Sequence, residues 1–132
     1  MKLDIQTGDV CSIERDFCRN CNNHYQHIRP SIVGVYVSNT FSKDVGDEKR
    51  SAGIIENVMQ CSHMQFTELH KFEKHVDGFP VFRAKIDGDH IVYCIDTDKK
   101  VIIFLRYFHN YSRYKRFLED DREILKTISR SL

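Results

Sequence analysis

The fold is decided by residues 82–95, FRAKIDGDHIVYCI, which we interpret as two strands joined by a tight turn. Asp87-Gly88 is a favoured dipeptide for a two-residue hairpin turn, and such a turn places Lys85 directly opposite His90. Directly opposed residues share one face of a sheet, so Arg83, Lys85 and His90 are expected to cluster on one side. The predicted register pairs Phe82 with Tyr93, Arg83 with Val92, Ala84 with Ile91 and Lys85 with His90. The opposite, buried side is expected to hold Phe82, Ala84, Ile86, Ile91, Tyr93 and Ile95.

Size and composition indicate one folded domain. The 132 residues suffice for a single domain with a core, and 20 Lys and Arg nearly cancel 19 Asp and Glu. Bulk charge therefore does not indicate a dedicated duplex-binding protein, although eleven of the basic residues lie in residues 79–132. The longest apolar run, residues 101–105, is too short to span a bilayer, and residues 1–5 open no signal-peptide core. We therefore expect no membrane partner. The odd count of 5 cysteines favours free thiols over a set of disulfides, and free thiols are typical of the reducing cytoplasm, where we expect the protein to be located.

The other elements follow from residue periodicity and turn signals. Residues 32–37 are rich in β-branched side chains and predict a strand, and apolar residues recur at helical spacing through residues 47–61. Further elements are expected as a short helix over 66–75, strands over 82–86, 90–95 and 101–107, and a helical stripe from Tyr114 to Ile128 that is interrupted at Asp121. They predict an α+β domain over residues 32–132, with a small twisted, mainly antiparallel sheet of about four strands, two helices on one face and a C-terminal helix. Residues 1–31 are expected to form a helical N-terminal extension.

Strand parity extends the basic cluster to the last strand. A four-residue turn that pairs Asp96 with Val101 would place Tyr107 opposite His90. His109 would then lie at the rim of the same face, close to the basic pair of the preceding hairpin.

The order of the elements and several short motifs resemble the RelE/ParE toxin superfamily. In that family a helical hairpin ends at a glycine, and a basic strand, an apolar strand closing on Asp and a strand with a basic or His-containing tail follow. The matching segments here are residues 69–79, FRAKI at 82–86, HIVYCID at 90–96 and LRYFH at 105–109. The tail at residues 106–111, RYFHNY, is most similar to the YoeB and HigB branches, in which a histidine near the end of the last strand takes part in catalysis.

The resemblance implies a RelE-like fold and the toxin of a type II toxin–antitoxin system, a metal-independent mRNA endoribonuclease acting at the ribosomal A site. The implied partners are a cognate antitoxin, mRNA and the ribosome, with no cofactor, and a homodimer is left open. By position, Arg83 and Lys85 match the basic pair of the family and His109 the catalytic residue of the last strand. Tyr111 or Tyr114 matches the nearby catalytic tyrosine. His90 departs from the pattern, because the family usually has arginine in that place.

Cleaving RNA without a metal requires removal of the 2′-hydroxyl proton, stabilisation of a charged phosphorane and protonation of the leaving 5′-oxygen. Imidazole suits either proton transfer, and fixed cations suit the phosphorane. We therefore assign His109 as general acid or base, and His90 as the second proton-transfer group. The other predicted site residues are Arg83 and Lys85 to neutralise phosphate, Tyr114 or Tyr107 to orient the scissile group or stack a base, Glu68 as an additional base, and Arg106, Arg113 and Lys115 as phosphate contacts.

The N-terminal extension contains a cysteine–histidine cluster, Cys18, Cys21, His24 and His27, with C-x2-C-x2-H-x2-H spacing. Zinc accepts two thiolates and two imidazoles, but structural sites normally separate the two ligand pairs by a longer loop. A helix that buries small cysteines against the domain fits the spacing better, so no metal site is predicted.

Two other functions fit the same fold. A ParE-like protein would inhibit DNA gyrase and perform no RNA chemistry. The other is a non-catalytic interaction or regulatory domain in which the catalytic cluster has decayed. Discrete mRNA cuts after induced expression would distinguish the nuclease from the gyrase inhibitor. A neighbouring small open reading frame with a DNA-binding pattern and an acidic tail would favour a toxin over an interaction domain.

Overall fold

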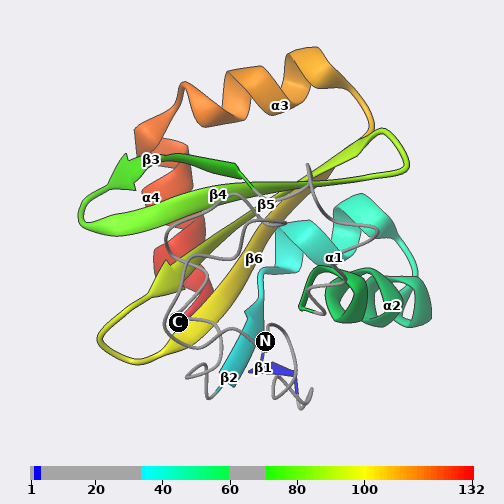
Figure 1. Cartoon of the computed structure of the whole chain (residues 1–132), viewed down its shortest axis with the longest axis horizontal. Helices are drawn as coiled ribbons and strands as arrows, with labels where there is room; N and C mark the ends of the chain where they lie inside the picture. Colours follow the sequence, from blue (N-terminus) through cyan, green and yellow to red (C-terminus); the bar gives the residue numbers. More distant parts are fainter. Residues whose placement is uncertain (1, 4–33, 60–70) are drawn as a thin grey trace.

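The computed structural model of the chain describes residues 2–3, 34–59 and 71–132. In chain order the elements are β1 (Lys2–Leu3), β2 (Gly34–Val37), α1 (Asn39–Val45), α2 (Glu48–Met59), β3 (Lys71–Val76), β4 (Phe79–Ile86), β5 (Asp89–Asp96), β6 (Val101–Phe108), α3 (Tyr111–Leu118) and α4 (Asp121–Ser131). Within these ranges one six-stranded sheet has the order β1-β2-β6-β5-β4-β3, and β2 with β6 is its parallel pair. The predicted α+β class and mainly antiparallel sheet are confirmed, while the expected count of four strands is too low (Figure 1). No helix in the described ranges is long and apolar enough to cross a membrane.

The β4–β5 hairpin forms as the sequence predicts. Its pairs include Phe82 with Tyr93, Arg83 with Val92, Ala84 with Ile91 and Lys85 with His90. Asp87 and Gly88 have φ angles of 50° and 83°, the left-handed geometry that a two-residue type I′ turn requires. The turn therefore fixes the register that brings Lys85 beside His90.

A β-bulge interrupts the pairing of β5 with β6. Near the turn between these strands the register is as predicted, with Asp96 opposite Val101. Farther along, the consecutive β5 residues 92 and 93 lie opposite residues 106 and 104. Leu105 is therefore an extra residue in β6.

The bulge overturns the predicted arrangement at the end of β6. Because one extra residue reverses the alternation of side chains, Phe108 rather than Tyr107 lies opposite His90. Tyr107 packs in the apolar cluster on the other face of the sheet. The expectation that Tyr107 and His109 share the face of the basic pair is therefore wrong, and the cause is Leu105.

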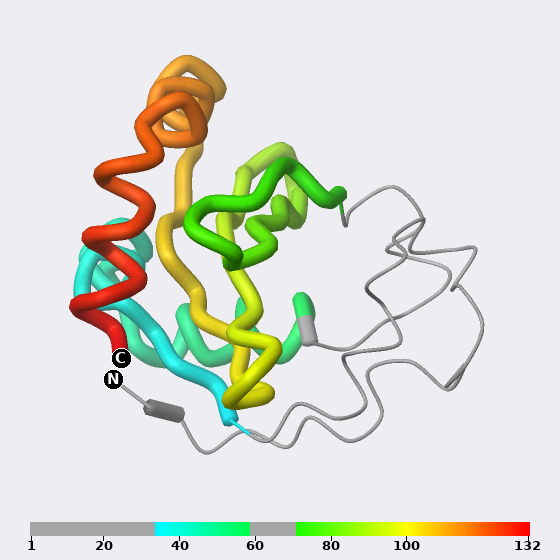
Figure 2. Tube along the Cα trace, turned by 90° about the vertical axis from the view of Figure 1, so that its left-hand side faces the viewer, coloured from blue at the N-terminus to red at the C-terminus, as the bar shows by residue number. Residues whose placement is uncertain are grey.

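Helices cover both faces of the sheet, which gives the fold three layers (Figures 1 and 2). On one face, α1 and α2 contribute Phe41, Val45, Ile54, Ile55 and Val58 to the core. On the other, α3 and α4 contribute Tyr114, Phe117, Leu118, Ile124 and Ile128. The predicted apolar side of the hairpin is buried against α1 and α2, as the alternation indicated. The opposite side is apolar too along most of its length, through Val81, Val92, Cys94, Ile103 and Leu105. Cys94 is a buried free thiol, as predicted.

The helix predicted over residues 66–75 is wrong where the structure describes it, because Lys71–Val76 form the edge strand β3. Phe72 and Val76 have helical spacing in the sequence, yet they pack on opposite faces of the sheet. A register shift between Phe72 and Lys74 produces this arrangement. Pairing with β4 thus overrides the local periodicity.

The two ends of the chain differ in how far the structure tests them. The single helix expected at the C-terminus is two helices, since α3 ends at Leu118 and Asp120 caps α4 by accepting the Glu123 backbone N–H at 3.1 Å. At the other end, Lys2–Leu3 pair with β2, and the helix predicted for residues 4–31 lies outside the described residues. The domain boundary near residue 31 stays a prediction.

Contacts from α1 hold the bulged segment of β6. Ser38, the N-cap of α1, donates its hydroxyl to the Leu105 carbonyl at 2.6 Å. Asp44 accepts from Arg106 Nε at 2.6 Å and from the Tyr107 backbone N–H at 3.0 Å. The side chains of Arg106 and Asp44 are only 16% and 15% exposed, so this ion pair is shielded from solvent.

We predict that Asp44→Ala lowers the free energy of unfolding by about 3 kcal/mol, because Arg106 would stay mostly buried without its partner. Urea denaturation measures this loss. Glu56→Ala, an exposed position on α2, is the control and should change stability by less than about 0.5 kcal/mol. Equal unfolding midpoints for the two variants would contradict a stabilising role for the ion pair.

Candidate functional site

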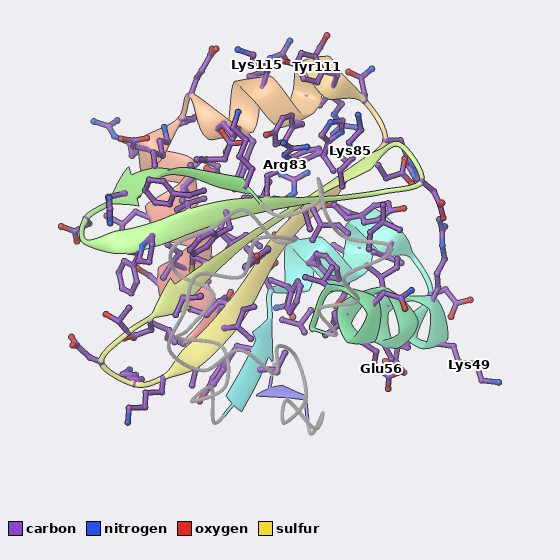
Figure 3. The ribbon with its side chains drawn as sticks, in the orientation of Figure 1. Lys49, Glu56, Arg83, Lys85, Tyr111 and Lys115 are labelled. Carbon is purple, nitrogen blue, oxygen red and sulfur yellow. The ribbon has the colours of Figure 1, made fainter. Side chains whose placement is uncertain are left out.

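A cavity of about 530 Å³ lies between α3 and the β3–β4–β5 part of the sheet. It is lined by Lys71, Glu73, Arg83, Lys85, His90, Tyr111, Tyr114, Lys115, Leu118 and Glu119. Figure 3 shows Arg83 and Lys85 between β4 and α3, the helix that carries Tyr111 and Lys115. The hairpin cluster predicted from the sequence therefore forms one wall of a cavity, and α3 supplies the facing wall.

The cavity is suited to an anion. Four of its side chains are cationic, namely Lys71, Arg83, Lys85 and Lys115, against the two carboxylates of Glu73 and Glu119. Lys85 and Lys115 are exposed, and neither forms an ion pair with another described residue. Positive charge therefore remains available to a ligand.

Glu73 organises the floor of the cavity. Its Oε1 accepts a hydrogen bond from the Tyr114 hydroxyl at 2.9 Å and lies 3.7 Å from Arg83 Nε. Arg83 Nε is buried and has no hydrogen-bond partner in the described part of the chain. Burial, together with the hydrogen bond to Glu73, raises the pKa of Tyr114, which keeps its hydroxyl protonated.

His90 is a buried imidazole at the wall of the cavity. The residue is 7% exposed, and its ring stacks on Tyr114 with centroids 4.4 Å apart and planes 20° apart. Its Nδ1 has no hydrogen-bond partner among the described residues. Burial lowers the pKa of His90, and the nearby cations Arg83 and Lys85 lower it further. His90 is therefore a neutral imidazole, the protonation state that a general base requires.

His109 belongs to a different cluster. Its Nδ1 lies 2.9 Å from Asp89 Oδ1, and its side chain is 63% exposed. The Tyr107 hydroxyl donates to the other oxygen of Asp89, and Arg50 donates to the Tyr107 oxygen at 3.3 Å. His109 does not line the cavity, so the expectation that it joins the basic pair is wrong in position.

The pKa shifts of this second cluster follow from its hydrogen bonds. Burial alone would raise the pKa of Asp89, but the hydrogen bonds from Tyr107 and His109 outweigh it, and the net shift is downward. Burial and the bond to Asp89 raise the pKa of Tyr107 to about 12. Asp89 is thus a carboxylate that orients both side chains, and Tyr107 is held by it and is not available to stack a base.

The remaining predicted site residues fall into three groups. Tyr114 and Lys115 line the cavity with Arg83, Lys85 and His90, as the sequence indicated. Arg106 and Arg113 line a separate cavity on the other side of α3, and Asp44 already holds the Arg106 guanidinium. The candidates that lie outside the described residues are Glu68, Cys18, Cys21, His24 and His27. Within the described ranges, no group of His, Cys, Asp and Glu is placed to hold a metal ion.

Sequence reasoning missed Lys71 and Glu73 as cavity residues. Both lie on β3, which the sequence pattern presented as a helix, so their position beside Arg83 could not be inferred. The cavity-lining residues of α3, by contrast, could be predicted from the sequence. These residues, Tyr111, Tyr114, Lys115 and Leu118, follow the i, i+3, i+4, i+7 pattern of one helix face.

Comparisons with known proteins leave the family open. No protein-family model matches the chain, and no curated protein matches it significantly. Among solved structures, the toxin–antitoxin complex RelBE2 from Mycobacterium tuberculosis is similar at 18% sequence identity and a TM-score of 0.41, over 58% of this chain and 95% of that chain. A likeness at this level carries no argument about activity, so the function must be inferred from the cavity itself.

We predict that Lys85→Gln raises the pKa of His90, because it removes a cation that disfavours the imidazolium. An NMR titration of the His90 ring protons measures the change. Lys49→Gln, on α2 beyond the other face of the sheet, should leave that pKa unaltered. Because the folded state lowers the pKa of His90, protonation favours unfolding, and stability should fall as the pH drops below the ordinary value of 6.5. An unchanged or lower pKa in Lys85→Gln would contradict the electrostatics described above.

Proposed function

We propose that the cavity beneath α3 binds a phosphodiester group of RNA and that the protein is a metal-independent endoribonuclease. The observation that supports this most directly is that the neutral imidazole of His90 lines one cavity together with four cationic side chains. A phosphate group would satisfy the free charge of Lys85 and Lys115 and would reach the guanidinium of Arg83.

The chemistry follows from the protonation states of the site. His90 accepts the 2′-hydroxyl proton, the 2′-oxygen forms a bond to phosphorus, and the bond from phosphorus to the 5′-oxygen breaks. Arg83 and Lys85 stabilise the negative charge of the phosphorane. Lys115 at the cavity mouth protonates the leaving 5′-oxygen. The products are a 2′,3′-cyclic phosphate and a 5′-hydroxyl end, and no metal or cofactor takes part.

Tyr114 and Glu73 act on His90 rather than on the substrate. The stacked Tyr114 ring fixes the plane of the imidazole, and its hydrogen bond to Glu73 fixes the ring of Tyr114. A pre-set imidazole loses no conformational freedom when the substrate binds, which lowers the barrier to proton transfer.

The biological setting of this proposal comes from the sequence resemblance to RelE-like toxins. On that basis the protein is the toxin of a toxin–antitoxin pair in the cytoplasm, it cleaves mRNA at the ribosomal A site, and a cognate antitoxin holds it inactive. The sequence assignment makes His109 the central catalytic residue, whereas the cavity favours His90 in that role.

Induced expression with mapping of transcript ends tests the proposal. The wild type should arrest growth and produce discrete cuts in mRNA with 5′-hydroxyl ends. His90→Ala should reduce cutting by about 10²-fold or more, and Arg83→Gln by about 10²-fold. Growth arrest without transcript cuts would contradict the nuclease and favour gyrase inhibition, and the absence of both effects would favour a non-catalytic domain.

A comparison of two histidine variants distinguishes the candidate catalytic residues. His109→Ala changes an exposed side chain that does not line the cavity, so we expect it to retain most of the cutting activity. His90→Gln keeps a polar side chain of similar reach but cannot act as a base near neutral pH, so it should be inactive. Circular dichroism spectra equal to the wild type confirm that each variant is folded. Loss of cutting in His109→Ala alone would overturn the assignment to His90.

A further inference from the structure

The helix α3 separates two basic cavities, and its residues divide between them. Tyr111, Tyr114, Lys115 and Leu118 line the first cavity, described above. Arg113, Arg116 and Phe117 line a second one of about 210 Å³, together with Asp120 beyond the end of α3 and residues of β6 and α4. The first set has the i, i+3, i+4, i+7 spacing of one helix stripe and residues 113, 116 and 117 have i, i+3, i+4 spacing, so the two cavities open on two sides of the same helix.

The second cavity holds three arginines and two carboxylates, those of Asp120 and Glu123. Arg113 and Arg116 are exposed, and neither forms an ion pair with another described residue. The third arginine there, Arg106, lies over the Phe108 ring at 4.7 Å and has its charge balanced by Asp44. Arg106 therefore forms a rigid floor, and the two α3 arginines supply the free charge.

Helix α3, which lies between the two cavities, has the composition of a surface that binds single-stranded nucleic acid. α3 contains three cationic residues and no acidic residue within Tyr111–Leu118. Tyr111 lies at the mouth of the first cavity and is 58% exposed, a high value for a large aromatic side chain. Cations that alternate with an exposed aromatic ring are the features by which proteins hold unpaired nucleic acid, through phosphate contacts and base stacking.

Acidic residues at the C-terminal end of α3 disfavour the binding of a polyanion there. Glu119, Asp120 and Asp121 follow the helix directly, and Asp120 also lines the second cavity. A polyanion would be repelled there and would cross the helix nearer its N-terminal half, where Tyr111 and Arg113 lie.

We infer that single-stranded RNA crosses α3, with one phosphate in the first cavity, a base stacked on Tyr111 and further phosphates held by Arg113 and Arg116. This inference rests on the proposed function, because it takes the phosphate in the first cavity to belong to RNA. An α-helix with its side chains is about 10 Å across, so a ligand with a single phosphate cannot occupy both cavities. The substrate inferred here is therefore an extended strand rather than a short oligonucleotide.

The inference predicts a dependence of affinity on ligand length. The probes are fluorescein-labelled 2′-O-methyl RNA, which cannot be cleaved through its 2′-oxygen, as a decanucleotide and as a dinucleotide. In fluorescence anisotropy, Arg113→Gln/Arg116→Gln should weaken decanucleotide binding about tenfold and reduce the slope of log affinity against log salt by about 1.4, the value for two phosphates of a single strand. Dinucleotide binding should stay within about twofold of wild type. Tyr111→Leu should weaken decanucleotide binding with no change in the salt slope, because stacking releases no counterions.

The control is Lys43→Gln/Lys49→Gln, which removes the same amount of charge from exposed positions on α1 and α2. It should leave the affinity for both probes unchanged. Equal effects of the two double variants, or wild-type protein that does not bind the decanucleotide, would overturn the inference. A decamer of glutamate that binds as tightly as the RNA would overturn it as well, and would indicate an acidic peptide as the ligand. The proposed nuclease activity is judged separately by the transcript cuts, which can persist if RNA binds the first cavity alone.

Discussion

One extra residue in the β5–β6 ladder determines which side chains meet at the candidate site. Without the bulge at Leu105, the alternation along β6 would place Tyr107 beside His90. With the bulge, Phe108 lies beside His90, and Tyr107 and His109 form hydrogen bonds with Asp89 on the other face of the sheet. The bulge is held by α1, through the Ser38 hydroxyl on the Leu105 carbonyl and the Asp44 carboxylate on Arg106. A contact on one face of the sheet therefore shapes the site on the other.

The two imidazoles at this end of the sheet have different environments, and these suit different roles. His90 is buried, stacked and surrounded by cations, which keeps it neutral. His109 is mostly exposed and bound to a carboxylate. Because a base must accept a proton next to a bound phosphate, the cavity with the free cations favours His90.

The hairpin could be predicted in full from the sequence, because Asp87-Gly88 determines both the turn and the register of the strands on either side. The register of β5 with β6 near Asp96 and Val101 could be predicted as well. The bulge was not, since no glycine or other local signal marks Leu105 and its stabilising contacts come from residues more than 60 positions away. For the same reason β3 could not be recognised: its helical spacing is genuine, but the open edge of β4 supplies hydrogen bonds that local sequence does not reveal. Most of the site was thus predictable: Arg83, Lys85, His90, Tyr114 and Lys115 were found, whereas Lys71 and Glu73 were missed.

We propose that the cavity of His90, and not the cluster of His109, holds the phosphodiester. NMR with the imidazole rings labelled would test this most directly, by following both histidines as a 2′-O-methyl RNA oligonucleotide is added at constant pH. Binding of the phosphodiester in the cavity should shift the His90 resonances in a saturable way and change those of His109 little. Saturable shifts confined to His109 would contradict the proposal and return the catalytic role to the end of β6.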